Sequence, residues 1–131
     1  MMTYEKYQFV YNSNDYNDRK LLAYAKSTPL KFAELDISKG TLNTSHLAEM
    51  CERTGASIHM LVNMKKVKEI DDSLGEMKDF DNLSKLVKSN PSLLKTPIFI
   101  IGKDYHFVKD MAGINKLTGF KAAGDSEVFQ K

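Results

Sequence analysis

The sequence predicts an α/β fold built on a four-stranded mixed sheet, with the element order β-α-β, a helical middle section, then β-β-α. Three observations support this prediction. A strand pattern, a helix pattern and a second strand pattern fit into about 30 residues near the amino end, which is typical of a parallel βαβ unit. The apolar run at residues 97–101 indicates a strand buried on both faces, at the centre of the sheet. Gly102-Lys103 then forms a tight connection to a further strand, which predicts an antiparallel hairpin.

The amino-terminal third contains the predicted βαβ unit. Residues 6–11 combine alternation with aromatic and β-branched side chains, so we expect the first strand there. Residues 20–26 are good helix formers that end shortly before Pro29, which predicts a helix. The pattern of residues 30–37 predicts the second strand. Three polar residues ahead of the helix are candidate N-caps: Asn14, Asp15 and Asn17.

The middle section is rich in helix signals. The apolar spacing of residues 46–54 predicts a helix that Gly55 ends, and residues 81–88 predict a shorter amphipathic helix. The apolar segment 58–62 does not distinguish a helix from a strand. Residues 65–68 are basic, but acidic residues follow within two helical turns, which favours a solvated helix face over a binding patch.

The carboxyl-terminal third completes the predicted sheet. The central strand occupies residues 95–101 and is opened by Pro97, whose peptide bond is trans on base rates. An antiparallel strand at residues 104–108 follows as an edge, and then a helix at residues 110–117. The polar tail from residue 124 is expected to be loose. Three apolar residues of the last helix are expected to face inward: Met111, Ile114 and Leu117.

The length and charge of the chain restrict the classes of function. A chain of 131 residues suits one domain. Its 19 basic and 17 acidic residues are mixed along the sequence, so no electrostatic footprint for nucleic acid or an anionic membrane is present. The amino terminus lacks the apolar core of a signal peptide, and no run of 18 apolar residues occurs. We therefore expect a cytoplasmic protein that binds neither nucleic acid nor a membrane.

Cys51 is the single cysteine of the chain, and it limits redox and metal chemistry. One cysteine excludes an intramolecular disulfide, a Cys-x-x-Cys pair and a multi-cysteine metal site. Its place on an apolar stripe with Leu47 and Met50 favours a core residue over a displaced nucleophile. His46, at a helix start, is expected at the surface, and no histidine has metal-ligand spacing. The sequence therefore predicts neither a metal nor a cofactor.

The segment from Asn90 to Ile98, Asn-Pro-Ser-Leu-Leu-Lys-Thr-Pro-Ile, resembles a signature of the glutaredoxin-linked arsenate reductases and Spx-like regulators. Members carry Asn-Pro-x-Leu, a few residues, then Arg-Pro-Ile or Arg-Pro-Leu. The resemblance covers nearly the whole chain. It implies a single thioredoxin-like domain over residues 1–131, a helical insertion at about residues 38–90, and a cis peptide bond before Pro97, in place of the trans bond that base rates favour.

The resemblance also implies where a catalytic site would lie, and this sequence departs from it there. Family reductases place a nucleophilic cysteine in the loop after the first strand, where a helix dipole and backbone N–H groups stabilise a thiolate and an oxyanion. The ungapped alignment puts Tyr16 at the nucleophile and Lys20 at the following arginine. In the family an arginine directly precedes the proline, and this chain has Thr96 at that position. A later arginine of the family aligns near Lys109. A phenol cannot form the sulfur adducts of thiol exchange.

We therefore expect a catalytically inactive member of this family that binds a protein partner or a small anion and acts as a regulatory module. The alternative is a glutathione- and glutaredoxin-dependent arsenate reductase, or another thiol oxidoreductase, that uses Cys51 or an unrecognised donor. A third interpretation keeps an oxyanion site without turnover. Acidic residues beside the first helix indicate that the remnant pocket is filled by the chain itself. The candidate ligand-binding residues are Asn12, Tyr16, Lys20, Thr96, Pro97 and Lys109.

Overall fold

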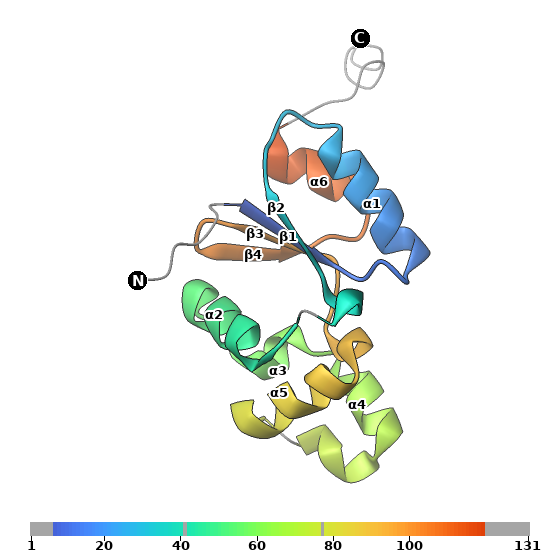
Figure 1. Cartoon of the computed structure of the whole chain (residues 1–131), viewed down its shortest axis with the longest axis vertical. Coiled ribbons are helices and arrows are strands. Elements are labelled where there is room, and N and C mark those ends of the chain that lie inside the picture. Colours follow the sequence, from blue (N-terminus) through green and yellow to red (C-terminus); the bar gives the residue numbers. More distant parts are fainter. Residues whose placement is uncertain (1–6, 41, 77, 120–131) are drawn as a thin grey trace.

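The computed structural model describes residues 7–40, 42–76 and 78–119 (Figure 1). The expectation of a loose tail from residue 124 lies outside the described residues. The sheet and its two companion helices comprise β1 (Tyr7–Tyr11), α1 (Tyr16–Lys26), β2 (Ala33–Asp36), β3 (Ile98–Ile101), β4 (Asp104–Phe107) and α6 (Met111–Thr118). The helices between β2 and β3 are η1 (Ile37–Lys39), α2 (Thr44–Thr54), α3 (Ile58–Leu61), α4 (Met64–Ile70), η2 (Asp72–Glu76), α5 (Phe80–Ser89) and η3 (Pro91–Leu93).

The four strands form one mixed sheet in the order β2-β1-β3-β4. β1 pairs with β2 in parallel, and β3 pairs with both β1 and β4 in antiparallel fashion. Phe9 of β1 lies opposite Phe99 of β3, whose other neighbour is His106 of β4. The predicted α/β class, the mixed four-stranded sheet and the hairpin at Gly102-Lys103 are confirmed.

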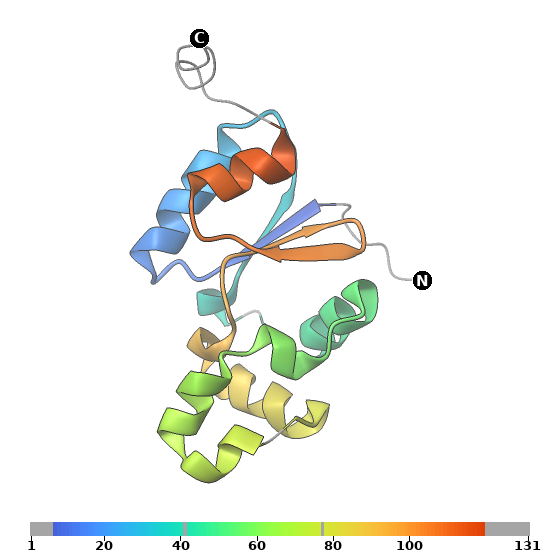
Figure 2. The ribbon, with the colours of Figure 1, turned by 180° about the vertical axis from the view of Figure 1, so that it is seen from behind.

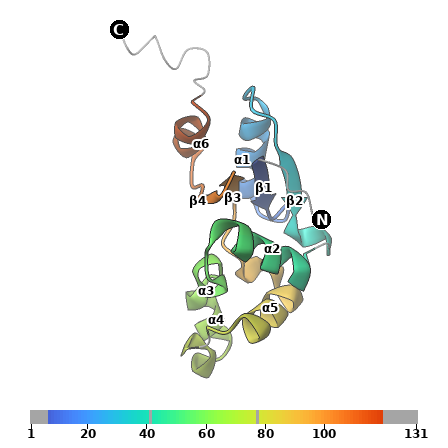
Figure 3. The same ribbon diagram turned by 90° about the vertical axis from the view of Figure 1, so that its left-hand side faces the viewer.

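Each face of the sheet is covered by its own set of helices (Figures 1 and 3). Because side chains alternate along a strand, β3 sends Phe99 to the face under α1 and α6, and Ile98 and Ile100 to the face that packs on the middle helices. α1 and α6 lie side by side on the first face (Figure 2), where the Tyr24 hydroxyl donates to Asn115 Oδ1 at 2.6 Å. The sheet therefore separates two apolar clusters that share its strands.

Several boundaries differ from the prediction. α1 begins at Tyr16 rather than at residue 20, because Asp15 caps it by accepting from the backbone N–H of Asp18 at 2.9 Å. β2 begins at Ala33 rather than at residue 30. β3 begins at Ile98 rather than at residue 95, after the Thr96–Pro97 peptide bond, which is cis as the resemblance implied.

The undecided segment 58–62 is a single helical turn, α3, followed by an isolated bridge between Val62 and Leu94. Met111 was expected to face inward, and this is wrong: its side chain is 40% exposed. Met111 is the first residue of α6, and only the next turn of that helix, with Ile114 buried, reaches the core. No helix among the described residues combines the length and apolar character needed to cross a membrane.

Candidate functional site

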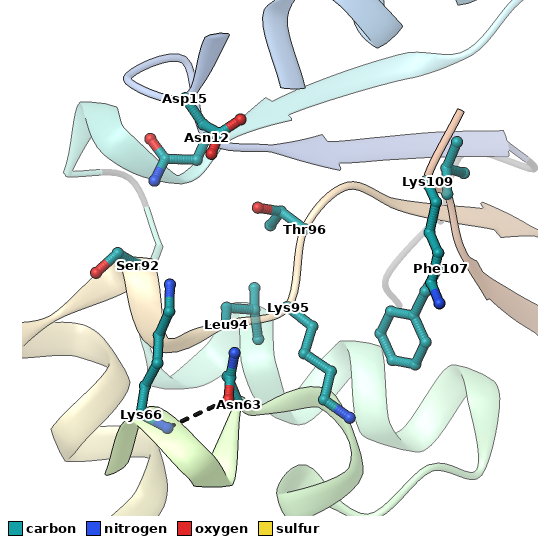
Figure 4. A pocket seen from close by; sticks show the side chains of 11 residues that line it. Asn12, Asp15, Asn63, Lys66, Ser92, Leu94, Lys95, Thr96, Phe107 and Lys109 are labelled. Carbon is teal, nitrogen blue, oxygen red and sulfur yellow. Dashed lines mark hydrogen bonds between the residues drawn. The ribbon is translucent and has the colours of Figure 1, made fainter. Parts of the chain in front are cut away.

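A cavity of about 500 Å³ lies where the sheet meets the middle helices (Figure 4). Four segments meet there: the loop between β1 and α1, the start of α4, the stretch from η3 to β3, and the end of β4. Each segment is held by a regular element, so the lining is positioned by the fold rather than by one long loop. The lining residues are Asn12, Asp15, Asn63, Lys66, Ser92, Leu94, Lys95, Thr96, Phe107, Val108 and Lys109.

The loop between β1 and α1 directs its backbone N–H groups to acceptors of the chain itself. The N–H of Asn12 donates to Asp18 Oδ2 at 2.9 Å, and the N–H of Ser13 donates to Asp36 Oδ1 at 3.1 Å. The N–H of Asn14 donates to the Asn12 side-chain oxygen at 2.9 Å, and that of Asp15 donates to the Asn12 carbonyl at 3.0 Å. These four amides are therefore occupied, in the loop where an oxyanion-binding protein of this fold would need free donors.

Asp18 supplies the internal anion of this loop. Its side chain is only 3% exposed, and it accepts hydrogen bonds from the Asn12 amide and from the Thr96 side chain. Burial raises the pKa of the Asp18 carboxyl above its usual range, the two hydrogen bonds oppose this rise, and the nearby carboxylate of Asp15 adds to it. Asp18 thus connects the loop to the residue that precedes the cis proline.

Asp36, at the end of β2, fixes the other side of the same loop. Its carboxylate accepts from the Ser13 N–H, from the Ser38 N–H at 3.0 Å and from the Ser38 hydroxyl at 2.8 Å. Burial alone would raise the pKa of Asp36, but these hydrogen bonds outweigh burial and lower it. The Ser13 and Ser38 hydroxyls are also hydrogen-bonded, at 2.7 Å. The loop is therefore held on both sides by carboxylates of the chain.

The cavity is also lined by cationic side chains. Lys66, Lys95 and Lys109 contribute ammonium groups from three different segments, whereas Asp15 is the only acid among the described residues of the lining. No ion pair joins these three lysines to a carboxylate within residues 7–40, 42–76 and 78–119. The Lys95 ammonium nitrogen lies 5.1 Å from the centroid of the Phe107 ring, a cation–π contact.

The structure brings together only some of the predicted ligand-binding residues. Asn12, Thr96 and Lys109 line the cavity, and Pro97 is buried directly after Thr96. Lys20 lines a separate surface depression, which it shares with Lys109. Tyr16 lines neither: its side chain is 71% exposed, and the Arg19 guanidinium lies 5.7 Å from its ring centroid.

Sequence reasoning missed the residues that the middle helices and β4 contribute. Lys66 is exposed on α4, as expected for a solvated helix face, and its side chain also lines the cavity, which was not predicted (Figure 4). Asn63 accepts from the Lys66 backbone N–H at 3.2 Å, so its capping role in α4 fixes both residues at the wall. Lys95 is adjacent to the recognised Thr96-Pro97 motif, which was a usable signal. The sequence around Phe107 held no such signal, because a strand pattern does not reveal what a residue of an edge strand faces.

Cys51 lies outside this cavity. It is half-buried on α2 and packs against the cluster below the sheet, as expected for a core residue, and burial raises the pKa of its thiol. Such a thiol is less readily ionised and therefore less nucleophilic at neutral pH. His46 was expected at the surface, but it is half-buried and its Nδ1 is shielded from solvent. Among the described residues, no three His, Cys, Asp or Glu side chains gather as a metal site.

Solved structures share this architecture. An arsenate reductase from Vibrio cholerae is 13% identical, with a TM-score of 0.66 over 87% of this chain and 98% of that one. A protein from Brucella melitensis that is related to arsenate reductase is 13% identical, with a TM-score of 0.63 over 88% of this chain and 97% of that one. A Staphylococcus aureus protein is 19% identical, with a TM-score of 0.64 over 84% of this chain and 96% of that one.

No protein-family model and no curated protein sequence matches the chain. At 13–19% identity, the structural likeness establishes the thioredoxin-like α/β fold and nothing finer.

Proposed function

We propose that this chain is a member of the arsenate reductase and Spx-like family that has lost thiol chemistry and acts as a binding module. Its ligand, a small anion or an anionic group of a protein partner, would occupy the cavity lined by Asn12, Thr96 and Lys109. The fold shared with arsenate reductases supports the family assignment. Tyr16 at the nucleophile position supports the loss of turnover, since a phenol does not exchange with sulfur.

One observation supports this proposal most strongly: the chain itself takes up the N–H donors of the loop between β1 and α1. A reductase of this fold needs those donors for a thiolate and an arriving oxyanion. Here the buried carboxylate of Asp18 accepts from Asn12 and Thr96, and Asp36 accepts from Ser13. An oxyanion would have to displace a carboxylate that is already hydrogen-bonded and would be repelled by its charge.

A reductase that uses Cys51 is the competing function. Cys51 does not line the cavity, and its pKa is raised rather than lowered, which is the opposite of what an attacking thiol requires. No observation favours a reductase that uses Cys51, and the experiment below includes the result that would support it.

The test is a coupled glutathione–glutaredoxin assay of arsenate reduction, run on the wild type and on Cys51→Ser. The Vibrio cholerae arsenate reductase is the positive control. We expect no turnover from either form of this chain. Turnover in both forms would overturn the proposed loss of chemistry. Turnover that disappears only in Cys51→Ser would assign the reaction to α2 and overturn the proposal in favour of the competing function.

A further inference from the structure

The cavity has a chemical character that an empty oxyanion pocket would not have. We propose that it binds an organic polyanion with a flat ring, of the class of nucleoside di- and triphosphates, through Lys66, Lys95, Lys109 and the ring of Phe107. This inference rests on the proposed function, because it names the ligand class of the same binding module. It differs from an inorganic oxyanion site, whose donors in the loop are already occupied by Asp18 and Asp36.

The charge of the lining favours a ligand with several negative groups. Three ammonium groups line a single cavity, and none is in an ion pair within the described parts of the chain. They come from α4, from the segment before β3 and from the segment after β4, so they surround the cavity rather than meet at one point (Figure 4). One tetrahedral oxyanion contacts such a set poorly. A chain of phosphate groups can reach two or more of them at once.

The size of the cavity leads to the same ligand class. About 500 Å³ is within the range of small-molecule sites, which extends from roughly 300 to 1,000 Å³. A single phosphate or arsenate ion would leave most of that volume to water. A nucleotide has separate apolar, hydroxyl and anionic parts, so it matches a cavity with more than one kind of wall.

Phe107 provides the apolar wall. Its side chain is 38% exposed at the end of the edge strand β4, although a phenylalanine is normally buried. The Tyr105 ring meets it at 77° with centroids 5.6 Å apart, and the Lys95 ammonium lies 5.1 Å from its centroid. An exposed ring held by a neighbouring aromatic and flanked by a cation is the arrangement on which bases stack in nucleotide-binding proteins.

Polar side chains on the remaining wall suit hydroxyl groups. The Asn12 and Asn63 side-chain oxygens accept backbone N–H groups of their own segments, at 2.9 Å and 3.2 Å, which leaves the amide nitrogens available to a ligand. In Figure 4 the Asn63 amide nitrogen points into the cavity. Asp15 lies on the side away from Phe107, where a carboxylate can accept from a sugar hydroxyl.

The experiment is isothermal titration calorimetry of the full chain, without divalent cations and at constant ionic strength. The probes are ATP, inorganic tripolyphosphate and inorganic phosphate. We expect saturable binding of ATP, weaker binding of tripolyphosphate and no saturable binding of phosphate. Absence of saturable ATP binding would overturn the inference. Equal affinity for ATP and tripolyphosphate would show that the ring of the ligand contributes nothing to binding, and would overturn the assignment to nucleotides.

Substitutions separate this site from general attraction to a basic surface. Lys66→Ala should weaken ATP binding about tenfold, as expected for the loss of one charged hydrogen bond. Lys65→Ala is the matched control, because Lys65 is the preceding exposed residue of α4 and does not line the cavity. It should change the affinity by less than about twofold. Equal losses in the two variants would show a surface effect and overturn the site.

Phe107→Ala tests the ring itself. We expect it to bring the affinity for ATP down to that for tripolyphosphate, whereas Phe107→Tyr keeps the difference because a phenol ring also stacks. Circular dichroism of each variant confirms that it is folded. A failure here leaves the proposed loss of turnover untouched, because the arsenate assay decides that point. Turnover in that assay would overturn the proposed function whatever the calorimeter shows.

Discussion

Asp18 occupies the position from which the loop and the segment before Pro97 are both held. Its carboxylate is buried, and burial alone disfavours the charged form. The hydrogen bonds from Asn12 and Thr96 stabilise the charged form and offset part of this cost. The raised pKa of Asp18 means that the folded protein binds this proton more tightly than the unfolded chain does. Its contribution to stability is therefore present below its ordinary pKa of 3.8 and is lost as the pH rises through the folded value.

Two substitutions of Asp18 separate its charge from its hydrogen bonds. Asp18→Asn removes the charge and keeps an oxygen for the Asn12 N–H, so we expect the free energy of unfolding at pH 7 to be maintained or increased. Asp18→Ala leaves the Asn12 amide and the Thr96 hydroxyl unpaired, and we expect it to lose about 1–3 kcal/mol. Urea unfolding at pH 4 to 8 measures both. Equal losses in the two variants would contradict this account of Asp18.

Cys51 gives a second prediction at this scale. Because the thiol is half-buried and its pKa is raised by burial, we expect a disulfide reagent at pH 8 to label the native protein at least about tenfold more slowly than the urea-unfolded protein. Stopped-flow absorbance gives both rates. Labelling of the native protein at the unfolded rate would show that α2 does not shield this residue.

Sequence alone anticipated some of these residue-scale features and not others. The acidic residues beside the first helix predicted a loop filled from within, and Asp18 fulfils this description. The burial of Asp18 was not predicted, because a carboxylate two residues before the first expected helical position, Lys20, is normally solvated. Lys66 and Phe107 were missed because their place in the cavity depends on how α4 and β4 pack, which no local pattern encodes.

At the scale of elements, the end of β2 holds the loop before α1. Asp36 makes this link through Ser13 and Ser38, and the hydrogen bonds hold its pKa below the usual range, although its burial acts in the opposite direction. A lowered pKa stabilises the fold above the ordinary value of 3.8, and this stabilisation is lost as the pH falls through the folded value.

Asp36→Ala should therefore lower the free energy of unfolding at pH 7 by about 1–3 kcal/mol, with the difference from wild type shrinking as the pH falls below about 4. Asp36→Asn should lose less, since its side-chain oxygen still accepts from Ser13. Chemical unfolding at pH 3 and pH 7 gives the comparison. A loss that stays constant across this range would mean that the charge of Asp36 does not contribute.

Elements whose signals were both local and strong were predicted well. The central apolar strand, its hairpin and the glycine-terminated α2 follow from residue types alone, since Gly55 adopts the left-handed conformation that ends the helix. The predicted boundaries were wrong where tertiary structure decides them. The first turn of α1, residues 16–19, carries no buried apolar residue, and segment 58–62 is helical over Ile58–Leu61 and then forms an isolated bridge between Val62 and Leu94.

At the scale of the whole molecule, the sheet couples its two apolar clusters. Phe99 belongs to the cluster under α1 and α6, and Ile100, the next residue of β3, belongs to the cluster with the middle helices. The strand cannot dissociate from one cluster and remain in the other. We therefore propose that the chain unfolds as the single domain that the sequence predicts, with the helices of residues 38–90 as an insertion that does not unfold separately.

Phe99→Ala and Ile100→Ala test this coupling. Each should destabilise the protein by about 2–5 kcal/mol and lower one common transition. Far-UV circular dichroism follows mainly the helices, and tyrosine fluorescence follows mainly the sheet and α1, because the tyrosines within the described part of the chain lie there. Transitions that separate in either variant would show two units instead of one.

The backbone N–H groups of the loop between β1 and α1 are held by acceptors of the chain itself, and the proposed loss of oxyanion chemistry depends on this. The direct measurement is a ¹H–¹⁵N NMR titration of the full chain with arsenate at constant ionic strength, following the amides of Asn12, Ser13, Asn14 and Asp15. We predict that these four resonances show no saturable shift, because their donors are held by Asp18, Asp36 and Asn12. A saturable downfield shift of these amides would mean that an oxyanion displaces the internal acceptors, and would contradict the account.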